Sequence, residues 1–176
     1  MRFRPLAIRG AYLIDTDAQE DERGSFCRAY CAAQFSDAGL DFRVVQTSLS
    51  SNRRANTLRG MHFAASPASE QKLVRCVHGA VFDVLLDLRG DEPTFRTWTA
   101  TELSADNRQA VLVPPGVAHG YVTLSDDSVL LYEMSEEYRA ELGGGVRYDD
   151  PSFGIAWPVR PEIISPRDRS YPDFVP

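Results

Sequence analysis

The stretches LRGMHF at residues 58–63 and QKLVR at residues 71–75 alternate polar and apolar side chains at the spacing of a β-strand. A period of two predicts that His62 and Arg59 lie on opposite faces of the first strand, with Gly60 on the same face as His62. A glycine next to the imidazole leaves space on that face. The sequence therefore predicts that His62 faces a ligand.

On both sides of this strand the same pattern continues as short strands separated by turn residues. Eight strands are expected, at residues 43–50, 57–63, 72–78, 80–88, 96–103, 110–113, 119–124 and 128–134. Such regular spacing is typical of a closed or double-sheet antiparallel architecture. Residues 81–88 are mostly apolar, which predicts a central strand buried on both faces.

The two ends of the chain show other patterns. We expect an opening strand at residues 6–14, an acidic loop at 15–24 and a short strand at 25–28. Residues 29–40 are rich in alanine and end near a glycine, which predicts a helix of about three turns. Glycine and proline are frequent from residue 136 onward, and they predict a loop-rich arm that wraps back over the barrel.

Length and composition are those of one domain with a proper core. The 176 residues are 43% hydrophobic and 25% charged. We expect N-terminal strands and a helix in residues 1–42, the β-core in 43–135 and the arm in 136–176. The net charge of −6 argues against nucleic acid as the main partner, although a local basic pocket for phosphate is compatible with it.

The cysteines Cys27, Cys31 and Cys76 do not have the spacing of a metal site, so we expect free thiols in a reducing compartment. No stretch has the length of a membrane span, and the first residues lack the apolar run of a signal peptide. We therefore expect a cytoplasmic protein with no membrane partner.

Five residues besides Arg59 could act together: His62, Lys72, His119, Tyr132 and Asp168. Each alone has a structural explanation, such as a hydrogen-bonded histidine, a turn cap, a core tyrosine or a solvated loop acid. Together they supply the base, acid, cation and orienting carboxylate that proton abstraction next to a carbonyl requires. The enolate formed in that reaction needs a Lys or His donor in a dry site.

A metal centre is the alternative use of the histidines. His62, His78 and His119 form no His-x-His pair, and His78 lies at an expected turn, where a structural or exposed role is typical. A site with two histidines and one carboxylate from distant strands stays open. We expect no metal and no cofactor.

A series of short motifs runs in order along nearly the whole chain: ERG-x-F (22–26), LRGMHF (58–63), QKLVR (71–75), FDV (82–84), DLR (87–89), PTF (93–95), LSADN (103–107), PGVAHGY (115–121), Tyr132, GVRYDDP (145–151) and IAWP (155–158). This series resembles the dTDP-4-dehydrorhamnose 3,5-epimerase family. It implies a cupin-type jelly roll, a homodimer, no metal, and epimerisation of a 4-keto-6-deoxy sugar carried on a nucleoside diphosphate.

The resemblance also implies roles for single residues. His62 would be the base that removes the proton from C3 or C5, with Asp168 as its orienting partner. Lys72, helped by His119, would stabilise the C4 enolate, and Tyr132 would return a proton from the opposite face. Substrate-binding roles are implied for Arg23 and Arg59 at the diphosphate, Tyr138 near the nucleotide or sugar, and for Phe26, Gln46, Ser48 and Arg167.

The chain departs from the family pattern at a few positions. Arg28 stands where the family usually has Glu, and Gln46, Thr47 and Ser48 stand where it usually has Gln-Asp-Asn. Ala64 replaces a Gln, and Gly143 replaces an acid. Most of these positions belong, by resemblance, to the nucleotide end of the site. Which base and sugar are recognised, and whether one or both centres are inverted, therefore stay open. A catalytically silent sugar-nucleotide-binding cupin and, less favoured, a metal-dependent cupin enzyme are the alternatives.

Overall fold

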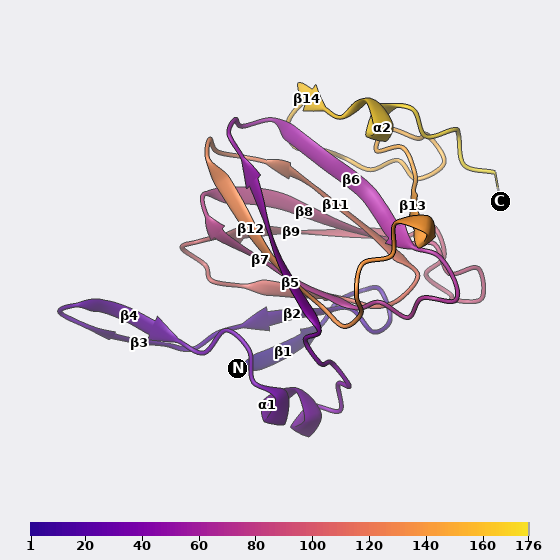
Figure 1. The fold of residues 1–176 in the computed structure, drawn as a ribbon. Coiled ribbons are helices and arrows are strands. Elements are labelled where there is room, and N and C mark those ends of the chain that lie inside the picture. Colours follow the sequence, from indigo (N-terminus) through magenta and orange to yellow (C-terminus); the bar gives the residue numbers. More distant parts are fainter. Residues whose placement is uncertain (176) are drawn as a thin grey trace.

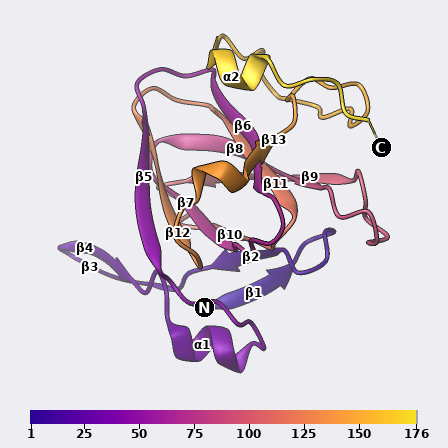
Figure 2. The ribbon, with the colours of Figure 1, turned by 45° about the vertical axis from the view of Figure 1, so that its right-hand side comes forward.

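Two β-sheets face each other and form the body of the protein (Figures 1 and 2). The computed structural model describes residues 1–175. The first sheet has the strand order β1 (Arg2–Pro5), β2 (Tyr12–Asp15), β10 (Ala110–Val113), β7 (Lys72–His78), β12 (Ser128–Met134) and β5 (Gln46–Asn52). The second has the order β13 (Gly143–Gly145), β6 (Thr57–Ala64), β11 (Val117–Thr123), β8 (Ala80–Asp87) and β9 (Trp98–Ser104), and β14 (Ile163–Ile164) pairs with β6. This is the all-β jelly roll that was predicted.

Apolar side chains fill three layers. Between the sheets, alternate residues of the facing strands pack together, among them Val74, Leu85 and Leu130. The helix α1 (Ala32–Asp37), whose Phe35 is fully buried, covers the outer face of the first sheet at β2, β10 and the start of β7. The C-terminal arm covers the outer face of the second sheet, where Phe153 packs in the same cluster as residues of β6 and β8. The prediction that β8 is buried on both faces is confirmed.

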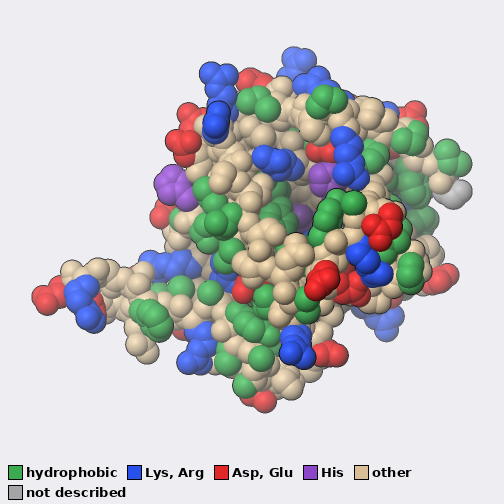
Figure 3. Space-filling view, viewed as in Figure 1, with side chains coloured by type: hydrophobic (Ala, Val, Ile, Leu, Met, Phe, Trp, Pro, Cys, Tyr) green, Lys and Arg blue, Asp and Glu red, His purple; other side chains and the backbone are tan. Residues whose placement is uncertain are grey.

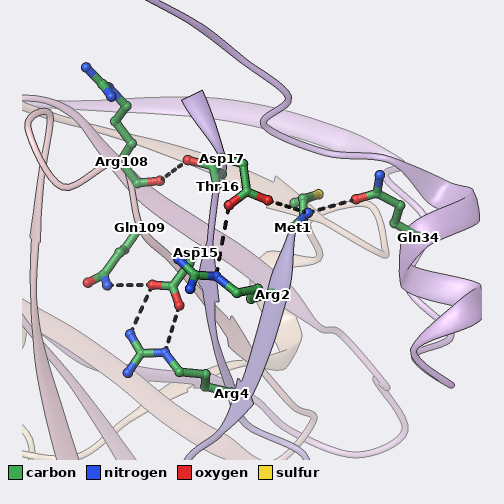
Figure 4. Close-up of polar contacts among 9 residues, drawn as sticks. All are labelled: Met1, Arg2, Arg4, Asp15, Thr16, Asp17, Gln34, Arg108 and Gln109. Atoms are coloured by element: carbon green, nitrogen blue, oxygen red, sulfur yellow. Dashed lines mark hydrogen bonds and ion pairs between the residues drawn. The ribbon is translucent and has the colours of Figure 1, made fainter. Parts of the chain in front are cut away.

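The N-terminal segment differs from the prediction. The strand expected at residues 6–14 is found only at its end, in β2; residues 6–11 form a turn in which Gly10 has a φ of +80°, and an unpredicted strand, β1, precedes it. Arg4 pairs with Asp15 across these strands at 2.8 Å, and the N-terminal amino group contacts Asp17 (Figure 4). The helix is also shorter than predicted, because the chain turns after residue 37 and only Phe35 reaches the core.

The acidic segment expected as a loop carries a strand. β3 (Ala18–Asp21) and β4 (Gly24–Cys27) form a separate hairpin that projects from the body (Figure 1). No third strand pairs with it within residues 1–175, and Phe26 near its end is 77% exposed. An isolated hairpin is marginally stable in water, so this one needs a further contact.

The other strands lie close to their expected places. Strands β7, β10 and β12 have the predicted bounds, and the remaining five of the eight differ by at most three residues at either end. The short strands β13 and β14, a 3₁₀ turn (Ala140–Leu142) and the helix α2 (Pro166–Arg169) lie in the arm. Within the described residues, no helix has the length and apolar character required to cross a membrane.

Candidate active site

A cavity of about 610 Å³ opens between the two sheets, at the end covered by the C-terminal arm. Strands β6, β11 and β12, the start of β7, and arm residues on both sides of β13 and β14 line it. Figure 3 shows histidine side chains inside a hollow on this face. The volume is in the range of small-molecule sites.

A β-bulge in β6 decides which side chains enter the cavity. Between two paired positions, β6 contains Gly60 and Met61 where β11 contains only Gly120. Gly60 has a φ of +132°, and a Cβ there would lie 2.5 Å from the Cα of Gly120. Because the bulge changes the alternation, Arg59 and His62 both line the cavity. The prediction that they lie on opposite faces is wrong.

The imidazole of His62 is held by a carboxylate from the arm. Its Nε2 lies 2.7 Å from Oδ1 of Asp168, whose Oδ2 accepts a hydrogen bond from the backbone N–H of Gly60 at 3.2 Å. Ser165 caps the short helix α2 by accepting a hydrogen bond from the N–H of Asp168. The Asp168 side chain is 4% exposed and that of His62 is 41% exposed.

Asp168 stays ionised in this setting. Burial favours its neutral form, but the hydrogen bond and the charge of His62, with the N–H of Gly60, outweigh burial and hold the pKa of Asp168 below its usual 3.8. A carboxylate at Nε2 fixes the tautomer and the orientation of the ring. The Nδ1 of His62 makes no hydrogen bond within residues 1–175 and is available to a ligand.

A second histidine pair lies beside the first. His119 is directly paired with His62 across β11 and β6. Its Nε2 lies 2.7 Å from Oδ2 of Asp83, and these side chains are only 5% and 1% exposed. The ring of His119 meets that of Tyr132 edge-on at 5.7 Å between centroids. Asp83 was not predicted, although a charged residue inside an apolar central strand is a signal that could have found it.

Tyr132 enters the cavity from β12 in the opposite sheet. Within the described residues its hydroxyl makes no hydrogen bond. Burial, reinforced by the nearby Tyr121 and Asp83, raises the pKa of Tyr132 well above its usual value. The hydroxyl therefore keeps its proton at neutral pH and can donate it to a ligand.

Four further cations line the cavity, and they differ in their partners. Arg139 Nη2 pairs with Oε2 of Glu136 at 2.8 Å. Lys72 Nζ lies 3.0 Å from Oε2 of Glu70, an acid that the sequence did not single out. Arg59 instead donates to Oδ1 of Asn52 at 2.8 Å, and Arg167 donates to the carbonyl of Gly143 at 3.1 Å. Neither Arg59 nor Arg167 has a carboxylate partner within residues 1–175. Both can therefore bind an anion.

Comparison with known proteins decides the family. The model of the family described as dTDP-4-dehydrorhamnose 3,5-epimerase matches residues 5–175. The chain belongs to this epimerase family.

Individual relatives agree with this assignment. A dTDP-4-dehydrorhamnose 3,5-epimerase of Streptomyces griseus is 42% identical over 97% of this chain and 85% of its own length. A dTDP-4-dehydrorhamnose 3-epimerase of Streptomyces niveus is 39% identical over 96% of this chain and 82% of its own. The crystal structure of the 3,5-epimerase from Bacillus anthracis, with TDP and PPi bound, has a TM-score of 0.95 and 36% identity, covering 98% of this chain and 99% of that one.

Not all the residues expected from the epimerase family meet at the cavity. His62, Asp168, Lys72, Tyr132, Arg59, His119, Tyr138 and Arg167 line it. Gln46 and Ser48 lie outside the lining, and Gln46 accepts a hydrogen bond from the backbone N–H of Tyr138 at 3.0 Å. Arg23 and Phe26 lie on the projecting hairpin, where Arg23 pairs with Asp21 at 2.6 Å.

The described residues do not contain the geometry of a metal site. Within residues 1–175 there is no group of three or more His, Cys, Asp and Glu side chains placed to hold a metal ion. Each histidine of the cavity is instead paired with its own aspartate.

Proposed function

We propose that the protein inverts C3, C5 or both in a 4-keto-6-deoxyhexose linked to a nucleoside diphosphate, in deoxysugar biosynthesis. The substrate would be dTDP-4-dehydro-6-deoxyglucose or a close relative. One observation carries the proposal: an imidazole held by a buried carboxylate shares a cavity with a protonated tyrosine from the opposite sheet. Family membership supports the same reaction.

The chemistry follows from these positions. His62 takes the proton from the carbon next to the C4 ketone, and the electrons of the broken C–H bond move to the ketone oxygen as an enolate. The ammonium of Lys72 stabilises the enolate. Tyr132, on the other side of the cavity, donates a proton to the same carbon from the opposite face, which inverts the centre. A proton returned from His62 would instead restore the starting configuration.

The diphosphate would bind to the two guanidiniums that have no carboxylate partner, Arg59 and Arg167. A forked cation matches phosphate oxygens in geometry and charge. Tyr138 is 61% exposed at the same cavity and offers a ring for stacking on the nucleotide or sugar. Gln46 would act by holding the backbone of Tyr138, and Ser48 lies next to it on β5.

We also propose that two copies form a homodimer through the outer face of β5, β7 and β12. Leu49 and Val77 are 67% and 44% exposed on this face. Arg75 Nε and Glu133 Oε2, also on this face, are buried without a hydrogen-bond partner. A second copy would cover the apolar side chains and the open edge of β5.

The hairpin gives this dimer a functional role. Arg23 and Phe26 lie on the projecting hairpin and do not line the cavity of their own chain, so we propose that they bind substrate in the cavity of a partner copy. Mixing Arg23→Ala and His62→Ala chains tests this directly. Random reassociation should restore about a quarter of wild-type activity, because half of the dimers then contain one complete site. No recovery, with dimers present, would contradict the exchange of hairpins.

We propose a cytoplasmic location on chemical grounds. Cys27, Cys31 and Cys76 are free thiols, two of them partly exposed. Thiols that remain free are typical of a reducing compartment.

The function is tested with a panel of nucleoside-diphosphate 4-keto-6-deoxy sugars in deuterium oxide. The mass gain gives the number of exchanged protons, and NMR gives the configuration of each centre. Two deuterons with two inverted centres would define a 3,5-epimerase, and one would define a single-centre enzyme. No deuterium from any sugar would contradict the function and favour a silent binding protein.

A further inference from the structure

Glu70 is the one carboxylate near Lys72 in the ion pairs of the described chain. Its Oε2 lies 3.0 Å from Lys72 Nζ, and both side chains line the cavity with exposed fractions of 10% and 17%. We propose that Glu70 is a positioning residue: it holds the Lys72 ammonium at the ketone end of the cavity and keeps it away from the diphosphate. This inference rests on the proposed epimerase function and adds a residue to it.

The backbone around Glu70 is built to hold this carboxylate in place. On one side, the N–H of Ser69 donates to Oε1 of Glu136 at 2.9 Å. On the other, the N–H of Gln71 donates to the hydroxyl of Ser135 at 2.8 Å. Lys72 is the first residue of β7 and is paired with strands on both sides. The loop can therefore set the distance between Glu70 and Lys72 before a ligand arrives.

Lysine needs such a partner more than arginine does. Its ammonium is a point charge at the end of a flexible four-carbon chain, and it follows the strongest nearby anion. In the proposed substrate that anion is the diphosphate, whereas the ketone oxygen becomes negative only during the reaction. A fixed carboxylate competes with the diphosphate for Lys72 and leaves its remaining N–H donors free for the enolate.

The distribution of carboxylates in the cavity supports this division. His62 and His119 each have an aspartate at 2.7 Å, as Lys72 has Glu70 at 3.0 Å. The guanidiniums of Arg59 and Arg167 have none within residues 1–175. The three side chains that would act on the sugar, His62, His119 and Lys72, thus each have a carboxylate partner. The two arginines that would hold the diphosphate, Arg59 and Arg167, have none in the described part of the chain.

A double-mutant cycle tests the role of Glu70. We expect Glu70→Gln to lower kcat for solvent deuterium exchange about tenfold without raising KM, because the loss falls on the transition state and not on binding. Glu70→Asp, which keeps the charge, should recover part of this loss. In a Lys72→Ala background, Glu70→Gln should cause no further loss, because Glu70 acts only through Lys72.

The controls separate this inference from the proposed function. Thermal unfolding of each variant shows that it is folded, and Glu70→Asp serves if Glu70→Gln does not fold. The role of Glu70 would be overturned if Glu70→Gln lowered kcat by the same factor in the wild-type and Lys72→Ala backgrounds. A wild-type kcat for Glu70→Gln, or a rise in its KM alone, would overturn it as well. Absence of exchange by the wild-type protein with every sugar would instead overturn the epimerase function itself.

Discussion

The two histidine–aspartate pairs of the cavity have the same chemistry and different surroundings. His62 and His119 are paired positions on neighbouring strands, and in each Nε2 lies 2.7 Å from a carboxylate oxygen. The side chain of His62 is 41% exposed, however, and that of His119 is 5% exposed. An imidazole must reach a ligand to take its proton. The comparison supports the proposal that His62, and not His119, is the base, because both have the aspartate but only His62 is well exposed to the cavity.

The origin of the two aspartates explains the difference. Asp83 belongs to β8 and is buried within the same sheet as His119. Asp168 comes from α2 in the C-terminal arm, which approaches β6 from outside the sheet. The inner pair is thus part of the scaffold around Tyr132, and the outer pair is assembled only when the arm docks.

The largest predicted effect is that of His62→Ala. This change removes the proposed base and should lower solvent deuterium exchange by about 10⁴-fold or more. The fold should persist, because His62 is not a core residue. Exchange and circular dichroism of the purified variant measure both. Exchange above a trace in folded His62→Ala would show that His119 or another group can act as the base.

Asp168→Asn should have the next largest effect. The amide keeps the shape of the side chain but removes the negative charge that would stabilise the imidazolium formed when His62 takes the substrate proton, so kcat should fall about 10²–10³-fold. KM should change little, because Asp168 is not expected to touch the nucleotide. A variant with wild-type kcat would show that the outer pair does not need its charge.

Asp83→Asn should affect stability more than catalysis, because it changes the buried histidine–aspartate pair. We expect a loss of about 1–3 kcal/mol in the free energy of unfolding, because a buried charged hydrogen bond is weakened. The fall in kcat should be only about tenfold, since we propose that His62, and not His119, takes the proton. Urea unfolding and initial rates measure the two effects. A loss of kcat as large as that of Asp168→Asn would make the inner pair equally catalytic.

The smallest predicted effect concerns stability against pH. The pKa of Asp168 is lower in the folded protein than its usual 3.8. Its contribution to stability is therefore fully present above this value and is lost as the pH falls through the folded pKa. The difference in unfolding free energy between wild type and Asp168→Asn should be constant above about pH 5 and shrink below it. A difference that grows on acidification would contradict an ionised Asp168.

Much of the fold could be predicted because its signals are local. Alternation and turn residues located the strands of the core, and glycine and proline marked the arm. The hairpin was missed because the acidic segment before Gly24 lacks the apolar face of a strand within the body. The turn before β2 was mistaken for strand because it includes Ile8, a fully buried apolar residue, and β1 before it was missed.

The site was harder to predict, because its geometry depends on contacts between distant strands. The bulge at Gly60 depends on the close approach of β11, which no local pattern shows, so Arg59 was assigned to the wrong face. Asp83 and Glu70 were missed because a single acid is usually solvated, and only the folded chain reveals its partner. The residues named by family resemblance on β6, β7, β11, β12 and α2 do meet at the cavity.

The most direct test of the two-sided site compares deuterium wash-in with inversion in Tyr132→Phe. The phenyl ring fills the same space but has no proton to donate, so His62 should still remove the substrate proton. We predict that solvent deuterium continues to enter the sugar with retained configuration, while inversion slows by about 10²-fold or more relative to wild type. Equal slowing of wash-in and inversion, or wild-type inversion, would contradict a base and an acid on opposite sides of the sugar.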